Sequence, residues 1–220
     1  MKKYWAELLG TYILVFVGTG AIMINEITGG TVSHLGVGLS FGLVVMAMIY
    51  AIGDISGAHI NPAVTIAFAV AKRFPKSQIL PYISFQLIGA VLASASLYFI
   101  FPEASSMGET LPLKGNWAQS FMLEFILTFI LMFVILNVST GSKEKGITAA
   151  LAVGGVVAFE ATFAGPICGA SMNPARSIAP AIFSADFTHL WLYVVATIFG
   201  AILAVYSCKL VQTKECCDNC

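Results

Sequence analysis

The stretch SGAHINPAVT at residues 56–65 returns 112 residues later as CGASMNPARS at residues 168–177, with five of the ten positions identical. Asparagine is a preferred N-cap residue, and proline is favoured at the first helical position because its missing N–H would have no partner there. Each Asn-Pro-Ala is therefore predicted to begin a helix. The apolar runs that follow, 63–71 and 175–183, are too short to cross a bilayer, which needs about 20 residues. Two such short helices at matching points of two halves indicate a permeation or binding site near the membrane midplane.

The composition is that of a membrane protein with several spans. Hydrophobic residues make up 58% of the 220 residues, charged residues make up only 10%, and the mean hydropathy is +0.89. The formal net charge is zero, which gives no indication of nucleic-acid binding. The apolar run at the N-terminus contains Glu7 and lacks a small-residue cleavage site, so it is predicted to be a retained span. Six spans are predicted, at 4–26, 34–53, 78–100, 118–139, 147–165 and 188–210, with short helices at 61–71 and 173–183.

The two halves of the chain carry the same order of elements. Glu7 and Thr11 in the first predicted span match Glu124 and Thr128 in the fourth, in both cases 117 residues later. Because each half has three spans, an odd number, the second half is predicted to insert upside down relative to the first. The prediction is an all-α membrane protein in which six transmembrane helices and two half-helices form an inverted repeat.

Basic residues predict the orientation in the membrane. Nine of the eleven lysines and arginines fall on one side of this topology, and the exceptions are Lys114 and Arg176. Loops that face the cytoplasm carry an excess of lysine and arginine, so both termini are predicted to be cytoplasmic. Trp5, Trp117 and Trp191 each lie near the start of a span, where indole side chains favour the membrane interface.

The paired motifs, each preceded by Gly-Ala, resemble those of the aquaporin family of major intrinsic proteins. The segment FAGPICGASMNPARS at residues 163–177 is most similar to the nodulin-like branch, and the resemblance covers nearly the whole chain. It implies a right-handed bundle assembled as a homotetramer, a multi-pass protein of the plasma membrane that needs no cofactor. Residues 1–210 would form the channel domain, as repeats 1–100 and 117–210 joined by loop 101–116, followed by a cytoplasmic Cys-rich tail at 211–220.

Two short helices that meet tip to tip would have three physical consequences. The side-chain amides of Asn61 and Asn173 could donate hydrogen bonds to a passing oxygen atom. Two helix N-termini, each with roughly +0.5 of an elementary charge, would disfavour cations and protons. The segments before the caps are predicted to be extended, so that their carbonyl groups line a pore. The motif residues are Asn61, Pro62, Ala63, Asn173, Pro174 and Ala175, and the predicted pore-lining loop residues are Gly57, Ala58, His59, Ile60, Gly169, Ser171 and Met172.

Arg176 is the clearest break in the repeat, because its counterpart is Val64. A charged side chain at this depth is costly and therefore indicates a function. The family resemblance makes Arg176 the filter arginine and adds Phe41, Ala161 and Ala170 as the other filter positions. Two alanines there predict a wide, weakly polar constriction that passes glycerol, urea or metalloid hydroxides as well as water. Two other positions favour water instead. Glycerol channels of the family typically have an aspartate directly after the filter arginine and a basic residue four residues later, whereas this chain has Ser177 and Ala181, as water channels do. The ranking of solutes therefore stays open.

Three glutamates within apolar spans support different interpretations. The resemblance assigns Glu7 and Glu124 a structural role, as buried carboxylates that accept hydrogen bonds from loop N–H groups. Glu160 has no such explanation, and we expect it either to bond the external loop or to be uncharged in apolar surroundings. A proton-coupled transporter that uses all three glutamates is the alternative from another functional class, and a glycerol, urea or metalloid facilitator with low water flux is the alternative within the family.

The remaining chemistry of the sequence is sparse. No arrangement of serine, cysteine, histidine or acidic residues suggests an enzyme, so the expected function is the passive conduction of water and small uncharged solutes. Four of the five cysteines lie at or near the C-terminus, where a cytoplasmic location disfavours disulfides. The thiols of Cys216, Cys217 and Cys220 could bind a soft metal or be acylated, but we expect a reduced tail without a metal.

Overall fold

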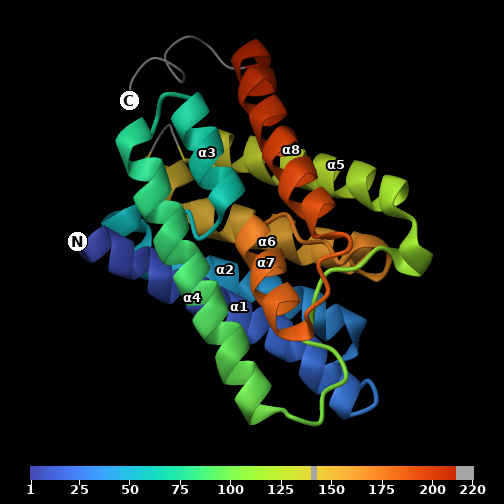
Figure 1. Ribbon diagram of the computed structural model, residues 1–220. Coiled ribbons are helices and arrows are strands. Elements are labelled where there is room, and N and C mark those ends of the chain that lie inside the picture. Colours follow the sequence, from blue (N-terminus) through green and yellow to red (C-terminus); the bar gives the residue numbers. More distant parts are fainter. Residues whose placement is uncertain (140–142, 212–220) are drawn as a thin grey trace.

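The computed structural model describes residues 1–139 and 143–211, which form eight α-helices and no strand (Figure 1). The helices are α1 (Lys2–Ile27), α2 (Ser33–Ser56), α3 (Pro62–Val70), α4 (Ile79–Ile100), α5 (Trp117–Val138), α6 (Lys143–Cys168), α7 (Pro174–Ser184) and α8 (Leu190–Val211). Two single 3₁₀ turns, Lys76–Gln78 and Leu113–Gly115, precede α4 and α5. The thiols of Cys216, Cys217 and Cys220 lie outside the described residues.

Six of these helices are long and apolar enough to cross a membrane, by length and composition. They contain 22 to 26 residues, whereas α3 has 9 and α7 has 11. At 1.5 Å per residue the two short helices reach only about half of the roughly 30 Å hydrocarbon core. The predicted fold class of six spans and two half-helices is confirmed.

The predicted span at 147–165 ends too early, because α6 continues through Pro166 to Cys168. A proline has no N–H, so the carbonyl group of Thr162, one turn earlier, loses its usual helical partner. In the structure the side chain of His34 in α2 supplies a substitute, with 2.6 Å between its Nε2 and the Thr162 oxygen. A hydrogen bond from another helix therefore allows α6 to continue past the proline.

Glycines allow the long helices to approach closely within each half and between the halves. In the first half α1 packs against α2 and α4, in the second half α5 packs against α6 and α8, and α2 packs against α6 between the halves. A Cβ atom at Gly89 would lie 2.2 Å from the backbone oxygen of Leu8, and one at Gly200 would lie 2.2 Å from that of Phe125. Small residues at such crossings are the usual basis of helix packing in membranes.

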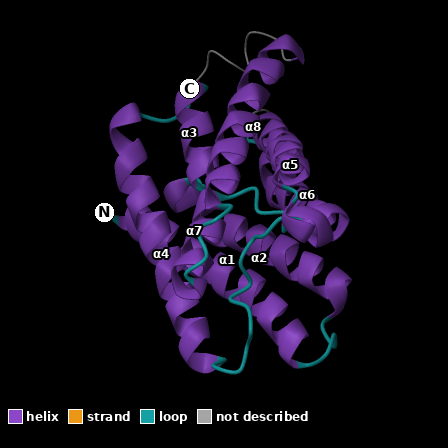
Figure 2. Ribbon diagram, turned by 45° about the vertical axis from the view of Figure 1, so that its right-hand side comes forward, coloured by secondary structure: helices purple, strands orange, loops and turns teal. Residues whose placement is uncertain are grey.

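The interior of the bundle carries polar side chains, while much of its outer surface is apolar. Leu80, Phe99 and Phe163 are each more than 70% exposed, whereas Glu7 and Glu124 are fully buried. This pattern suits a lipid environment, where polar groups must find partners inside the protein. Figure 2 shows loops running through the middle of the molecule, enclosed by helices.

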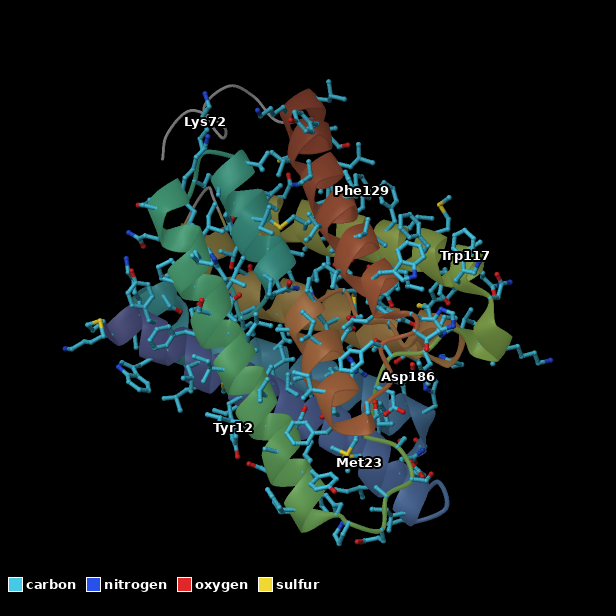
Figure 3. The ribbon with its side chains drawn as sticks, in the orientation of Figure 1. Tyr12, Met23, Lys72, Trp117, Phe129 and Asp186 are labelled. Carbon is cyan, nitrogen blue, oxygen red and sulfur yellow. The ribbon has the colours of Figure 1, made fainter. Side chains whose placement is uncertain are left out.

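Charged side chains mark the two ends of the bundle. Lys72 lies where α3 ends (Figure 3), and at the same end Arg73 donates a hydrogen bond to the carbonyl group of Leu136 in α5. Asp186 lies between α7 and α8, where the backbone N–H of Thr188 donates to its carboxylate and lowers the pKa of that carboxyl group.

Candidate functional site

The two short helices begin directly after their asparagines. The side-chain oxygen of Asn61 accepts a hydrogen bond from the N–H of Ala63 at 2.8 Å, and that of Asn173 accepts one from Ala175 at 3.0 Å. Both asparagines are in the extended region of φ/ψ space, and each is followed by a proline at the first helical position. This is the N-cap geometry that satisfies an otherwise unpaired N–H in the first helical turn.

The two caps meet inside the bundle. Nδ2 of Asn61 donates to the carbonyl oxygen of Met172 at 2.7 Å, and Nδ2 of Asn173 donates to that of Ile60 at 2.9 Å. Each asparagine is thus bonded to the loop that leads into the opposite helix. A primary amide has two N–H groups, so this exchange leaves one N–H of each asparagine for another acceptor.

The loops before the caps are not extended, so that prediction is wrong. Gly57 and Gly169 have φ angles of 85° and 84°, which a glycine adopts without strain. Positive φ angles between 41° and 53° also occur at four residues with side chains, namely Ala58, Ile60, Ala170 and Met172. The left-handed conformation costs roughly 1–2 kcal/mol at each such residue, so other contacts must stabilise these loops.

Two buried glutamates make those contacts. The carboxylate of Glu7 in α1 accepts hydrogen bonds from the backbone N–H groups of His59 and Ile60, at 2.9 and 2.7 Å. That of Glu124 in α5 accepts from Ser171 and Met172 at 2.7 and 2.9 Å. Glu7 accepts two further bonds, from the hydroxyl of Ser56 and the amide of Gln86, both at 2.7 Å. Each carboxylate therefore holds one cap loop in its left-handed conformation.

A cavity of about 120 Å³ lies against both asparagines. Its walls are largely apolar and come from α1, α2, α3, α5 and α6, while the two cap loops supply polar atoms. Eleven of the predicted site residues line it, namely Phe41, Gly57, Ala58, His59, Ile60, Asn61, Ala170, Ser171, Met172, Asn173 and Arg176. Ala161 and Gly169 are not among the lining residues, nor are the proline and alanine that follow each asparagine.

Arg176 is 1% exposed and is held from two sides. Its Nη1 donates to the carbonyl oxygen of Gly108 at 2.7 Å, and its Cζ lies 5.2 Å from the centre of the Phe41 ring. Nε and Nη2 make no hydrogen bond within the part of the chain that the structure describes. The guanidinium group is therefore fixed in place while some of its donors stay available.

The loop at 101–116 takes a part in this site that no motif in the sequence indicates. Besides Gly108, the loop places Thr110 against α7, where its hydroxyl donates to that of Ser177 at 2.8 Å. The carboxylate of Glu26 in α1 anchors the loop by accepting the N–H of Ser105 at 3.0 Å. These contacts join residues 67 to 79 positions apart. Nothing local in the sequence could have indicated them.

The expected hydrogen bond between Glu160 and the external loop is not made. The residue is fully buried in α6, and neither carboxyl oxygen has a hydrogen-bond partner among residues 1–139 and 143–211. Within the described residues, the carboxyl group therefore remains outside the hydrogen-bond networks that hold the two cap loops.

The geometry defines a class of protein: a helical membrane channel in which two short capped helices meet inside the bundle. The family model described as "Major intrinsic protein" matches residues 1–207. The chain belongs to this family, whose members are channels and not enzymes. The predicted family, its nodulin-like branch and a channel function are confirmed.

The relatives agree with this assignment. Aquaporin NIP1-1 of Zea mays is 45% identical over 213 residues, which are 96% of this chain and 75% of the relative. Aquaporin NIP3-1 of Arabidopsis thaliana is 43% identical over 223 aligned positions, covering 98% of this chain and 69% of the relative. The X-ray structure of the aquaglyceroporin from Plasmodium falciparum superposes with a TM-score of 0.89 at 25% identity, and covers 98% of both chains.

Proposed function

We propose that the protein is a passive channel for water and for small neutral solutes such as glycerol, and that it excludes protons and ions. The observation that carries the proposal is the reciprocal pairing of Asn61 and Asn173 on one cavity. Each asparagine keeps one N–H for a passing oxygen atom, because its other N–H is bonded to the opposite loop. A permeating molecule can therefore exchange hydrogen bonds with water for hydrogen bonds with the protein.

Electrostatics supports the exclusion of cations. The N-termini of α3 and α7 meet at the asparagines, and each carries roughly +0.5 of an elementary charge. Arg176 adds a full positive charge on the same cavity, next to Phe41. A cation would meet this field after losing its hydration shell, whereas a neutral molecule would not be repelled.

The direct test is transport by the purified protein in lipid vesicles. Stopped-flow light scattering is expected to show osmotic shrinkage well above that of protein-free vesicles, and reswelling when glycerol is the osmolyte. A proton gradient imposed on the same vesicles is expected to persist. Solute uptake that saturates and requires the proton gradient would contradict passive conduction.

Four residues are proposed to form the narrowest part of the channel: Phe41, Ala161, Ala170 and Arg176. Replacing Ala161 by histidine is expected to reduce glycerol permeability several-fold more than water permeability, because a large polar ring would narrow a passage that two alanines leave wide. The ratio of the two permeabilities, measured on one preparation, checks this. Gly155→Ala in the same helix is the control, since a Cβ there meets no atom within 4 Å. Equal losses of both permeabilities would show that Ala161 is not a filter position.

Glu160 distinguishes this channel from the proton-coupled alternative. Glu160→Gln replaces the carboxyl group by an amide of the same shape that has no ionisable proton. We expect the water and glycerol permeabilities of this variant to lie within about two-fold of those of the unmodified protein. Neither the variant nor the unmodified protein is expected to leak protons. Loss of solute uptake in this variant, together with uptake driven by a proton gradient in the parent, would favour the transporter.

We further propose a homotetramer in the plasma membrane with both termini cytoplasmic, and one channel domain of two inverted repeats over residues 1–210. Support for this orientation comes from the basic residues near Lys72 at one end of the bundle. Cysteine substitution at Lys72 and Asp186, followed by labelling with an impermeant thiol reagent in cells, tests the orientation. Asp186→Cys is expected to react from outside and Lys72→Cys only after lysis.

A further inference from the structure

Gly18 lies in the middle of α1 and is buried against α2. A Cβ atom built on Gly18 would lie 2.1 Å from Cε1 of Phe41, 2.5 Å from Cδ1 and 2.6 Å from Cζ. Three atoms of one aromatic ring thus occupy the space that any other residue type would need. The edge of the Phe41 ring rests directly on the backbone of α1.

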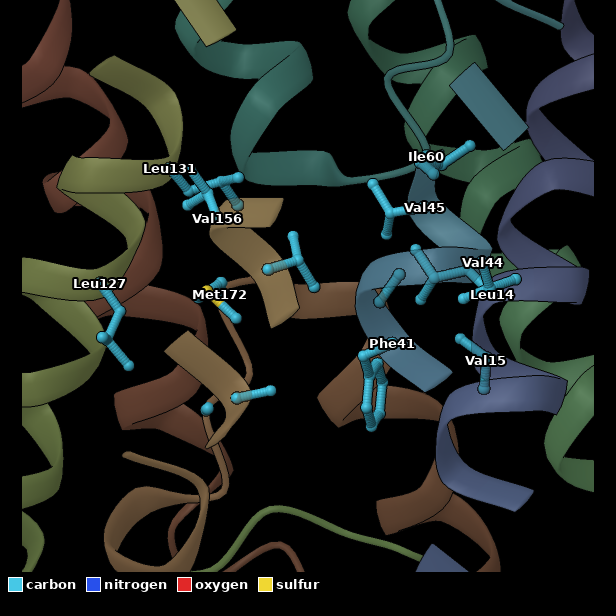
Figure 4. Close-up of a cluster of buried hydrophobic side chains, with 14 of the residues drawn as sticks. Leu14, Val15, Phe41, Val44, Val45, Ile60, Leu127, Leu131, Val156 and Met172 are labelled. Atoms are coloured by element: carbon cyan, nitrogen blue, oxygen red, sulfur yellow. The ribbon is translucent and has the colours of Figure 1, made fainter. Parts of the chain in front are cut away.

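The same ring belongs to the site. Phe41 lines the cavity, and its ring centre lies 5.2 Å from Cζ of Arg176. Figure 4 shows Phe41 on α2 beside Val15 of α1, with Val44 and Val45 one turn further along α2. The position of the ring between α1 and Arg176 therefore fixes how far it projects into the cavity.

We propose that Gly18 is a positioning residue that determines solute selectivity: by having no side chain, it lets the Phe41 ring withdraw into α1 and leaves the passage beside Arg176 wide enough for a polyol-sized solute. This inference rests on the proposed channel function. Gly18 touches no permeating molecule, and it acts only through the ring of Phe41.

The direction in which the ring would move follows from packing. An ordinary contact of a Cβ atom begins at about 3.4 Å, so a methyl group at Gly18 requires a shift of about 1.3 Å from the present 2.1 Å. The buried side chains around Phe41 belong to a close-packed core that includes Leu14, Val15 and Val44. Phe41 also lines the cavity, which offers the ring free space, so we expect the ring to move toward the cavity and the passage to narrow. A narrower passage hinders glycerol more than water, because glycerol is larger.

The experiment compares four proteins in vesicles by stopped-flow: the parent, Gly18→Ala, Phe41→Leu, and the double variant. For Gly18→Ala we expect the ratio of glycerol to water permeability to fall at least tenfold. In the double variant the leucine that replaces Phe41 is smaller and leaves room for the methyl group, so the ratio is expected to return to that of Phe41→Leu alone. Gly20→Ala is the matched control, because it adds a methyl group two residues further along α1 that meets only the flexible end of Leu97, at 3.1 Å.

The outcomes separate this inference from the channel proposal. If the parent protein conducts neither water nor glycerol above protein-free vesicles, the proposed function itself is wrong. If the parent conducts and Gly18→Ala keeps the parent's permeability ratio, the role of Gly18 is overturned. If Gly18→Ala is not recovered as folded protein, its recovery in the Phe41→Leu background supports the proposal, since the ring is then the obstacle. Failure to fold in both backgrounds contradicts the proposal.

Discussion

Replacing Glu7 by alanine is expected to reduce the yield of folded protein at least tenfold. The change leaves the N–H groups of His59 and Ile60 without their acceptor in the middle of the bundle. A buried donor without a partner costs about 1–3 kcal/mol, so the two together cost about 2–6 kcal/mol. That is a large share of the roughly 5–15 kcal/mol by which a typical protein is stable. The yield of monodisperse protein in size-exclusion chromatography, and its thermal midpoint in detergent, measure the effect.

The matched control for this prediction is Glu103→Ala, in the exposed part of the loop at 101–116. It removes the same functional group and is expected to change the yield by less than two-fold. The yield of Glu7→Gln is expected to lie between those of Glu7→Ala and the unmodified protein. Its amide oxygen can accept one of the two N–H groups, but its NH₂ group faces the other and cannot accept it. A normal yield of Glu7→Ala would mean that the cap loop keeps its left-handed conformation without the carboxylate.

Replacing Arg176 by valine is expected to make the channel permeable to protons and small cations. Valine is the residue at the matching position of the first repeat, Val64, so the change removes the charge while keeping a residue that the repeat already contains. A unit charge about 5 Å away, at an effective dielectric constant of about 20, contributes about 3 kcal/mol to the barrier. At about 1.4 kcal/mol per factor of ten, the leak should rise by about two orders of magnitude. Water permeability should not fall.

A pH-sensitive dye inside vesicles, with a potassium diffusion potential as the driving force, measures this leak. Arg176→Lys is the control for charge: it keeps the positive charge but lacks the planar group that bonds Gly108 and lies over Phe41. It is expected to stay tight to protons while its selectivity among neutral solutes changes. If the Arg176→Val channel leaked protons no faster than the parent, the whole electrostatic barrier to protons would lie at the two helix N-termini.

The sequence predicted the helix starts well and the loops between them poorly. The starts at Pro62 and Pro174 follow from local chemistry, because an asparagine cap and a proline act within one helical turn. The positive φ angles of Ile60 and Met172 oppose local preference, so a prediction from sequence gave extended backbone instead. The carboxylates that hold these two residues come from positions 53 and 48 residues earlier in the chain.

The end of α6 and the surroundings of Arg176 also depend on contacts between residues far apart in the chain, which local sequence rules do not include. Local rules end a helix before Pro166, and they cannot include a histidine 128 residues away that bonds the carbonyl oxygen of Thr162. Arg176 was conspicuous in the sequence because it breaks the repeat. That Gly108 holds it and that Phe41 rests on Gly18 could not be inferred, because these contacts join separate helices and a loop.

The amino-acid sequence alone identifies the kind of protein, through apolar spans of membrane length, a repeated Asn-Pro-Ala, and an arginine where the repeat has a valine. These features are encoded by residue type and short-range spacing, which act over a few helical turns. Tertiary structure alone decided how the two caps bond each other's loops, which donors of Arg176 stay available and how far Phe41 projects into the cavity. Such distances depend on how closely helices approach, and that is set by contacts between segments far apart in the chain.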